Sequence, residues 1–307
     1  MRNYRGIDVG RVFFACLIPM LHIGLSGTVV DFIRQYLSRL GVPFFFAVSG
    51  MFLAESINKR GHREAFRRYV WNTGRLLLVW LIIYMPLFVF QSGGIPLREF
   101  LFQTPAYLWF LTSLLIAAIP FCLVRNRKAL QYAAVLLYIW GTIFGGAYQW
   151  LIGGCPLYES IFLTTRNGIF FALPLMCIGE ATRKQETASM PLLFLFGGIL
   201  WAEISFVGAH VSPSDDRSMY LFLPLFTYYL VLAFRSWNPN IDTRYFRGIS
   251  SAIYLMQYGI IAVVMKIAWI LHIQGMWINW VTLLCVWTFP AIFYLSFKNT
   301  KLVKLLF

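Results

Sequence analysis

The sequence predicts an all-α integral membrane protein with ten transmembrane helices and both termini in the cytoplasm. Of its 307 residues, 59% are hydrophobic and only 12% are charged, whereas a soluble domain has about 25% charged residues. The mean hydropathy is +0.68, and the apolar residues form continuous runs without the alternation of a membrane β-barrel. This composition excludes a soluble enzyme, a disordered chain and a disulfide-rich scaffold.

Ten apolar runs reach the length of about 20 residues that a membrane-spanning helix needs. They lie at residues 7–26, 40–57, 69–91, 107–124, 129–150, 162–179, 190–209, 217–234, 248–271 and 277–296. The first run follows Arg2 and Arg5 and has no small-residue cleavage site after it, so we expect it to be retained as the first span. The segments between the runs are short, which predicts one polytopic domain over residues 1–307.

The Lys and Arg residues orient these spans. With the N-terminus inside, eighteen of them fall on inner segments and four on outer segments, an asymmetry typical of cytoplasmic loops. The outer four are Arg34, Arg39, Arg98 and Arg217. The net charge of +14 therefore comes from loops and not from a basic domain, which excludes a nucleic-acid partner and leaves the lipid bilayer as the partner that composition itself implies.

The first span carries three residues that lipid disfavours, Asp8, Arg11 and His22, and such residues are candidates for a functional site. Asp8 and Arg11 are three positions apart, so we expect them to form an ion pair near the inner interface. Arg11 and His22 are eleven positions apart, which places them on one helix face about 16 Å apart along the axis. They would then line one cavity from its inner end toward its outer end. The alternatives are an interfacial anchor for Asp8 and Arg11, and a bond to a backbone carbonyl for His22.

The second and third spans offer further candidates. Ser49 supplies a hydroxyl in mid-span, and Gly50 beside it favours the close packing of two helices. Arg67 and Arg68 lie at the inner mouth of the third span, with Arg75 about two turns deeper. A planar guanidinium group suits phosphate or carboxylate. A basic inner loop explains Arg67 and Arg68 equally well, but it does not explain Arg75.

The sixth and seventh spans add Arg166 and Glu203, and Glu203 has His210 about two turns further on to pair with. The GxSxG, Walker, GxGxxG and HExxH motifs are absent from the sequence. The five cysteines are scattered and form no CxxC pair, so we expect no metal site. Any catalysis must then come from histidine, acidic or arginine side chains inside the membrane.

Three motifs in the first 111 residues resemble the acyltransferase 3 family of ten-span membrane acyltransferases. The first is Tyr4-Arg5-Gly6-Ile7-Asp8, followed by Arg11 and His22. The second is Val42-Pro43-Phe44-Phe45-Phe46-Ala47-Val48-Ser49-Gly50, and the third is Leu108-Trp109-Phe110-Leu111. The order and spacing of the three motifs carry the resemblance.

The second half of the chain shows a narrower resemblance, to the membrane domain of VanT-type serine racemases, which belongs to the same family. It is carried by Thr165-Arg166-Asn167-Gly168-Ile169-Phe170-Phe171 and by Arg217-Ser218-Met219-Tyr220. We expect the soluble racemase domain to be absent here.

The family resemblance implies that the protein moves an acyl group, commonly acetyl, from a cytoplasmic acyl-CoA to a hydroxyl of an envelope glycan or lipid-linked sugar. It also implies a place in the cytoplasmic membrane of a bacterium. Arg11 and His22 match the family's catalytic pair, with Asp8 beside them and His22 as general base. Arg68 matches an arginine that would bind the phosphates of acyl-CoA, and Arg67 and Arg75 accompany it. The candidates for substrate binding are Ser49, Trp109, Arg166 and Glu203.

The chain differs from the family pattern at three positions. Asn72 replaces the second arginine of the third-span motif, Tyr107 replaces a histidine before Leu108, and Gln257 replaces a histidine in the ninth span. An alternative function is transport of serine or another small polar metabolite, since transporters also line a path with charged side chains. An acyl-CoA site requires a phosphate clamp at its inner mouth, and a serine carrier does not. A third alternative is an inactive family member that acts as a scaffold for envelope enzymes.

Overall fold

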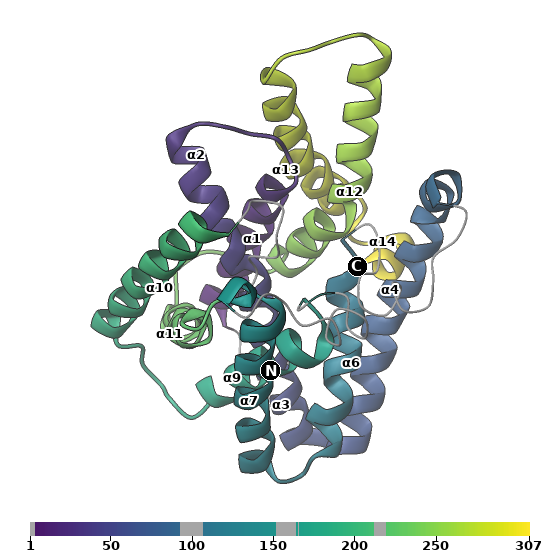
Figure 1. Cartoon of the computed structure of the whole chain (residues 1–307). Coiled ribbons are helices and arrows are strands. Elements are labelled where there is room, and N and C mark those ends of the chain that lie inside the picture. Colours follow the sequence, from purple (N-terminus) through teal and green to yellow (C-terminus); the bar gives the residue numbers. More distant parts are fainter. Residues whose placement is uncertain (1–3, 93–106, 152–163, 165, 212–218) are drawn as a thin grey trace.

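A computed structural model describes the chain except residues 1–3, 93–106, 152–163, 165 and 212–218, and it describes residues 88–92 by their backbone alone. The described part is helical, with no strand in these ranges. The helices are α1 (Arg5–Leu17), α2 (Thr28–Phe32), α3 (Gly41–Arg60), α4 (His62–Ser92), α6 (Trp109–Leu123), α7 (Arg127–Gly145), α9 (Leu173–Thr182), α10 (Met190–His210), α11 (Leu223–Ser236), α12 (Phe246–Ile270), α13 (Trp277–Phe297) and α14 (Lys301–Leu306) (Figure 1). The residues Arg2, Arg98, Thr165, Arg217 and Ser218, which the sequence assigns to loops or motifs, lie outside the described residues.

Several of these helices are long and apolar enough to cross a membrane. Five such stretches occur in the described ranges: Thr28–Arg60, His62–Leu87, Met190–His210, Phe246–Ile270 and Trp277–Phe297. Two shorter apolar helices, Trp109–Leu123 and Gly168–Thr182, accompany them. The protein is therefore a multi-pass membrane protein, and the part of it that the structure describes is all-helical. The total of ten spans and the cytoplasmic position of both termini stay predictions.

The first predicted span, 7–26, is not one continuous helix. The α-helix α1 ends at Leu17, and the chain continues as a 3₁₀ turn, η1 (Ile18–Leu21), with Pro19 in its first turn. Proline lacks the backbone N–H that an α-helix requires and clashes with the preceding turn, which explains the early end. The expectation that Arg11 and His22 lie on one face of a single α-helix is therefore wrong.

The second predicted span is longer than the apolar run at 40–57. Helical structure begins at Thr28 and continues to Arg60, over 33 residues. It passes through a π-helical turn, η2 (Ile33–Leu37), and a 3₁₀ turn, η3 (Ser38–Leu40), before α3. Its first part carries Arg34 and Arg39, which the sequence assigned to an outer loop because charge lowers the hydropathy there.

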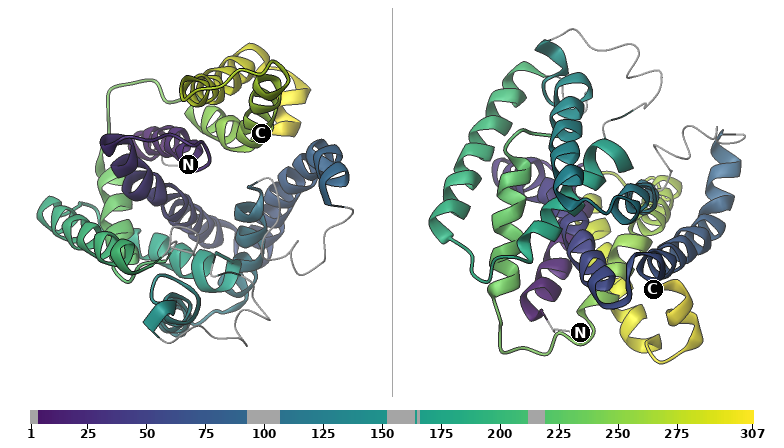
Figure 2. Two further views of the ribbon diagram at one scale, coloured as in Figure 1. Left: turned by 45° about the horizontal axis from the view of Figure 1, so that its top comes forward. Right: turned by 90° about the horizontal axis from the view of Figure 1, so that it is seen from below.

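The helix α3 runs through the middle of the bundle, where it contacts α1, α4, α9 and α11 (Figure 2). Two glycines allow α3 and α9 to pack backbone against backbone. A Cβ atom on Gly50 would lie 2.1 Å from the carbonyl oxygen of Met176, and one on Gly179 would lie 1.7 Å from that of Ala47. The prediction that Gly50 serves close helix packing is confirmed.

The last helices form a separate group beside this bundle. The helices α12 and α13 pack side by side as a hairpin, drawn in yellow-green in Figure 1. The hairpin contacts the bundle through α1, which packs on α12, and through α14, which packs on α4. This arrangement places α12 opposite α3, α4 and α6, and the space between them holds the candidate site.

Candidate functional site

Two adjoining cavities lie between α1, η1, α3, α4, α6 and α12. The first has a volume of about 220 Å³ and is lined by Arg11, so we call it the Arg11 cavity. The second has a volume of about 250 Å³ and is lined by His22, so we call it the His22 cavity. Ile18, Val42 and Tyr254 line both of them. Arg11 and His22 therefore serve neighbouring cavities that share a wall, and not one cavity as the sequence predicted.

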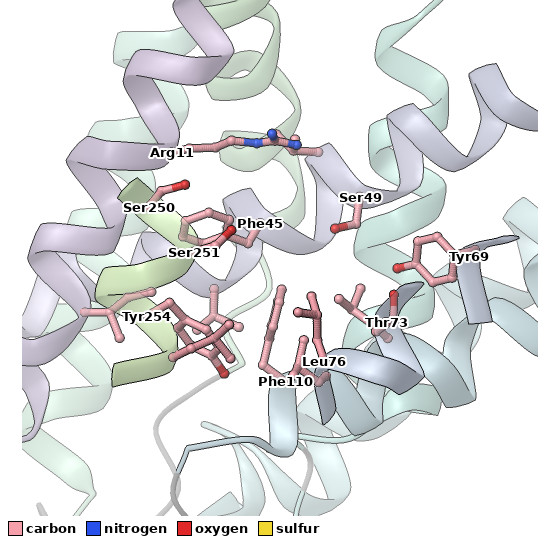
Figure 3. Close-up of a pocket in the computed structure, with 16 residues that line it drawn as sticks. Arg11, Phe45, Ser49, Tyr69, Thr73, Leu76, Phe110, Ser250, Ser251 and Tyr254 are labelled. Atoms are coloured by element: carbon pink, nitrogen blue, oxygen red, sulfur yellow. The ribbon is translucent and has the colours of Figure 1, made fainter. Parts of the chain in front are cut away.

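The Arg11 cavity brings together hydroxyl groups from three helices. Arg11 lies at one end, and the side chains of Ser49, Tyr69, Thr73, Ser250 and Ser251 surround the space beside it (Figure 3). The hydroxyls of Ser49 and Tyr69 both point toward the middle of this space from the same side. This lining supplies both donors and acceptors of hydrogen bonds within apolar walls.

The guanidinium group of Arg11 is held by a buried carboxylate. Asp8, whose side chain is 3% exposed, lies 3.7 Å from Arg11 Nη1, which confirms the predicted ion pair. The same Oδ1 atom accepts a hydrogen bond of 2.8 Å from Nε of Arg247, in the first turn of α12. Both guanidinium groups lie over the ring of Phe52, at 5.0 Å for Arg11 and 5.6 Å for Arg247. Asp8 thus joins α1 to α12 at one end of the Arg11 cavity.

We expect Asp8→Asn to lower the free energy of unfolding by about 3 kcal/mol, because it leaves two neighbouring guanidinium groups without their shared anion. The measurement is the midpoint of thermal unfolding of the purified protein in detergent. Adding Arg247→Gln to Asp8→Asn should recover part of the loss, since it removes one of the two unpaired charges.

The matched control for Asp8 is Asp242→Asn. Asp242 pairs with Arg244 at 3.2 Å, but both side chains are well exposed, so this change should cost less than about 1 kcal/mol. If Asp8→Asn and Asp242→Asn lower the free energy of unfolding equally, Asp8 is not the buried residue that joins α1 to α12.

The His22 cavity presents an accessible imidazole. His22 ends the turn η1, is exposed, and stacks on Tyr107 with 3.7 Å between ring centroids and 16° between ring planes. Neither ring nitrogen has a hydrogen-bond partner among the described residues, so the alternative of a bond to a backbone carbonyl is not found there. Within the part of the chain that the structure describes, both nitrogens are therefore available to a bound molecule.

Two of the predicted substrate-binding residues line the His22 cavity. Trp109 and Arg166 both border it, and the guanidinium carbon of Arg166 lies 5.8 Å from the centre of the Trp109 ring. Two of the three positions that depart from the family pattern, Tyr107 and Gln257, border the same cavity, whereas Asn72 borders neither cavity. The structure thus brings His22, Trp109 and Arg166 together with Tyr107 and Gln257.

The three arginines predicted at the third span lie apart from both cavities. Arg67, Arg68 and Arg75 line a groove of about 950 Å³ along α4. Arg68 Nε lies 2.5 Å from one carboxylate oxygen of Glu64, and Arg67 Nη2 lies 2.9 Å from the other. Nε of Arg75 is buried and has no hydrogen-bond partner in the part of the chain that the structure describes. The groove is a basic surface on the opposite side of α4 from Tyr69 and Thr73.

Glu203 lies in neither cavity. It accepts hydrogen bonds from the hydroxyl of Tyr148 at 2.7 Å and from the backbone N–H groups of Leu221 and Phe222 at 2.6 and 3.0 Å. It thereby satisfies the free N–H groups that precede α11. The predicted contact with His210 does not form, because His210 bonds to the carbonyl of Phe206 and stacks on Trp150.

Reasoning from the sequence missed most of the hydroxyl lining and also Arg247. Tyr69 and Thr73 are four positions apart on α4, and Ser250 and Tyr254 are four positions apart on α12. This spacing puts each pair on one helix face and was the available signal. No three His, Cys, Asp or Glu side chains gather as a metal-binding group within the described residues, and the absence of a metal stays a prediction.

Comparison with known proteins places these features in context. The family described as an acyltransferase domain, Acyl_transf_3, matches residues 4–297. An amino-acid racemase of Enterococcus faecalis is 24% identical over 296 residues, which cover 86% of this chain and 42% of that protein. A serine/alanine racemase of Enterococcus gallinarum is 26% identical over 289 residues, which cover 83% of this chain and 40% of that protein. The chain thus spans about two fifths of the length of these curated relatives. No solved structure matches it.

Proposed function

This chain belongs to the acyltransferase 3 family, and from that premise we propose that it is a membrane O-acyltransferase. The donor is a cytoplasmic acyl-CoA, with acetyl as the expected acyl group, and the acceptor is a hydroxyl of an envelope glycan or lipid-linked sugar. The observation that carries the proposal is that the two cavities adjoin at Ile18, Val42 and Tyr254, since this places a donor in one next to an acceptor in the other. The proposed location is the cytoplasmic membrane of a bacterium.

The proposed reaction gives His22 the role of general base. A neutral imidazole nitrogen takes the proton of the acceptor hydroxyl, whose oxygen attacks the carbonyl carbon of the thioester. The carbon–sulfur bond then breaks, and the CoA thiolate leaves and takes up the proton. An ester and free CoA are the products. The exposed imidazole, with no hydrogen bond to the described part of the chain, supports this role.

The Arg11 cavity suits the narrow arm of an acyl-CoA. That arm carries two amide groups, which can exchange hydrogen bonds with hydroxyls such as those of Ser49, Thr73 and Ser251. Arg11 adds a positive charge toward the anionic end of the donor. The groove with Arg67, Arg68 and Arg75 is the proposed binding surface for the phosphates. Because this groove and the Arg11 cavity lie on opposite sides of α4, a donor that occupies both must pass around the start of α4 at His62.

We expect purified protein in lipid to bind radiolabelled acetyl-CoA saturably, and Arg68→Ala to weaken binding about tenfold, the effect of one lost charge-assisted contact. Glu64→Gln should strengthen binding, because it frees Arg67 and Arg68 from their carboxylate partner. Arg125→Ala is the control, since Arg125 is exposed and lies outside the groove. Binding that is unchanged in Arg68→Ala would remove the groove from the donor site.

Transport of serine or another small polar metabolite is the second candidate. Two polar-lined cavities in series also fit a path for a small solute. Absence of saturable acetyl-CoA binding at any concentration would favour this candidate. Uptake of labelled serine into vesicles that contain the protein would then be the next measurement.

A further inference from the structure

Gln257 is a buried polar side chain without a partner. It lies on α12, is 0% exposed and lines the His22 cavity. Neither Nε2 nor Oε1 of its amide has a hydrogen-bond partner among the residues that the structure describes. An amide buried in this way is unfavourable unless something else satisfies it. Its place on the cavity wall points to a bound molecule as the missing partner.

Four of the other polar residues around the cavity are already engaged. The hydroxyl of Tyr254 donates to the carbonyl oxygen of Tyr107, and the hydroxyl of Ser38 donates to that of Ile33 at 3.1 Å. Arg39 and Arg166 also have interactions of their own. His22 and Gln257 are therefore two side chains of the wall that still offer hydrogen-bonding atoms.

Tyr107 shows that this wall is held in a specific conformation. Its φ is +62°, in the left-handed region that a tyrosine rarely adopts. The stacking of its ring on His22 and the bond from Tyr254 to its carbonyl hold the residue there. Strain of this kind is characteristic of functional sites, and here it keeps one face of the imidazole covered.

We propose that Gln257 selects the molecule that enters the His22 cavity, and that it takes a neutral group able both to donate and to accept a hydrogen bond, such as a sugar hydroxyl or amide. A carboxamide carries a donor and an acceptor side by side, but no charge. The apolar side chains of Ile18, Val42 and Phe171 line the cavity together with the positively charged Arg39 and Arg166, and such surroundings disfavour a cationic group. This inference rests on the proposed function and specifies the acceptor part of it.

The test measures sugar binding without any acyl donor. Three probes share one ring but differ in charge: N-acetylglucosamine, glucosamine and glucuronate. We expect the whole chain in lipid to bind N-acetylglucosamine at least about tenfold more tightly than the cationic glucosamine. The carboxylate of glucuronate can instead be attracted by Arg39 and Arg166, so its binding should not depend on Gln257. Gln257→Leu, which has nearly the same size, should weaken the binding of N-acetylglucosamine about tenfold.

The midpoint of thermal unfolding distinguishes a role of Gln257 in sugar binding from a merely structural role. Gln257→Leu removes an unsatisfied polar group, so it should raise the unfolding midpoint of the sugar-free protein by about 2 °C. The same change should weaken the binding of N-acetylglucosamine. Thr227→Val is the matched control, because Oγ1 of Thr227 on α11 is also buried, has no partner in the described ranges and borders neither cavity. That control should raise the midpoint and leave sugar binding unchanged.

The outcomes keep the two proposals apart. If Gln257→Leu binds N-acetylglucosamine as the unchanged protein does, or if glucosamine binds to the unchanged protein equally well, the role of Gln257 is refuted, whether or not the protein binds acetyl-CoA. If none of the sugars binds at 100 mM, the ligand class is refuted as well. If N-acetylglucosamine binding depends on Gln257 but acetyl-CoA does not bind, the inference about Gln257 stands and the proposed transfer reaction fails.

Discussion

His22→Ala should reduce the turnover of acyl transfer about 1,000-fold, the size of effect expected when a general base is removed. The affinity for acetyl-CoA should change by less than about twofold, because His22 borders the neighbouring cavity and not the one with Arg11. The measurement is transfer of a labelled acetyl group to an acceptor sugar by protein in lipid, together with equilibrium binding of the donor.

His210→Ala provides the control for His22. His210 also ends a helix and stacks on an aromatic ring, but its Nδ1 is bonded to the carbonyl of Phe206 and it borders neither cavity. Its removal should leave turnover unchanged. Full transfer activity in His22→Ala would eliminate His22 as the base and, with it, the proposed mechanism.

Gly179→Ala should lower the free energy of unfolding by about 3 kcal/mol or more, the typical result of forcing a methyl group into a closely packed contact. The added Cβ would lie 1.7 Å from the carbonyl oxygen of Ala47. The oxygen belongs to the backbone of α3, and the Cβ is bonded directly to the backbone of α9, so neither atom can rotate away and α9 must move away from α3. The fraction of monodisperse protein after purification and the midpoint of thermal unfolding both measure the loss.

Gly198→Ala is the corresponding control. Gly198 is also helical, but a Cβ there would meet no atom within 4 Å. Alanine favours a helix over glycine by up to about 1 kcal/mol, so this change should be neutral or stabilising. A loss in Gly198→Ala as large as that in Gly179→Ala would show that the close contact of α3 and α9 is not the cause.

Much of the fold could be predicted from hydropathy. The runs at 190–209 and 277–296 correspond to α10 and α13 within one residue at each end, because an apolar run and a membrane helix share the same length requirement. The helical extension of α3 back to Thr28 could not be predicted, since that segment is too polar to register as a span. The end of α1 at Leu17 was indicated by Pro19, whose effect in a membrane helix depends on its neighbours.

The site was predictable only where its contacts are local in sequence. Asp8 and Arg11 are three residues apart, and their pairing follows from helix geometry. Arg247 is 239 residues from Asp8, and its contact depends on how α12 packs against α1. In the same way, three-dimensional packing alone brings Gln257 and Tyr107 to the cavity that His22 lines.

The long helix from Thr28 to Arg60 determines how far above the bilayer centre the His22 cavity lies. At about 1.5 Å per residue, Ser38 lies about 33 Å along the axis from Arg60, whereas the hydrocarbon layer is about 30 Å thick. If Arg60 marks the cytoplasmic headgroups, as the charge distribution predicts, Ser38 and Arg39 at the cavity wall reach the outer headgroups. A molecule approaching from outside would then meet the cavity in the wet interfacial layer. That molecule could remain attached to a large hydrophilic polymer throughout, because no part of the polymer would have to enter the hydrocarbon layer of the membrane.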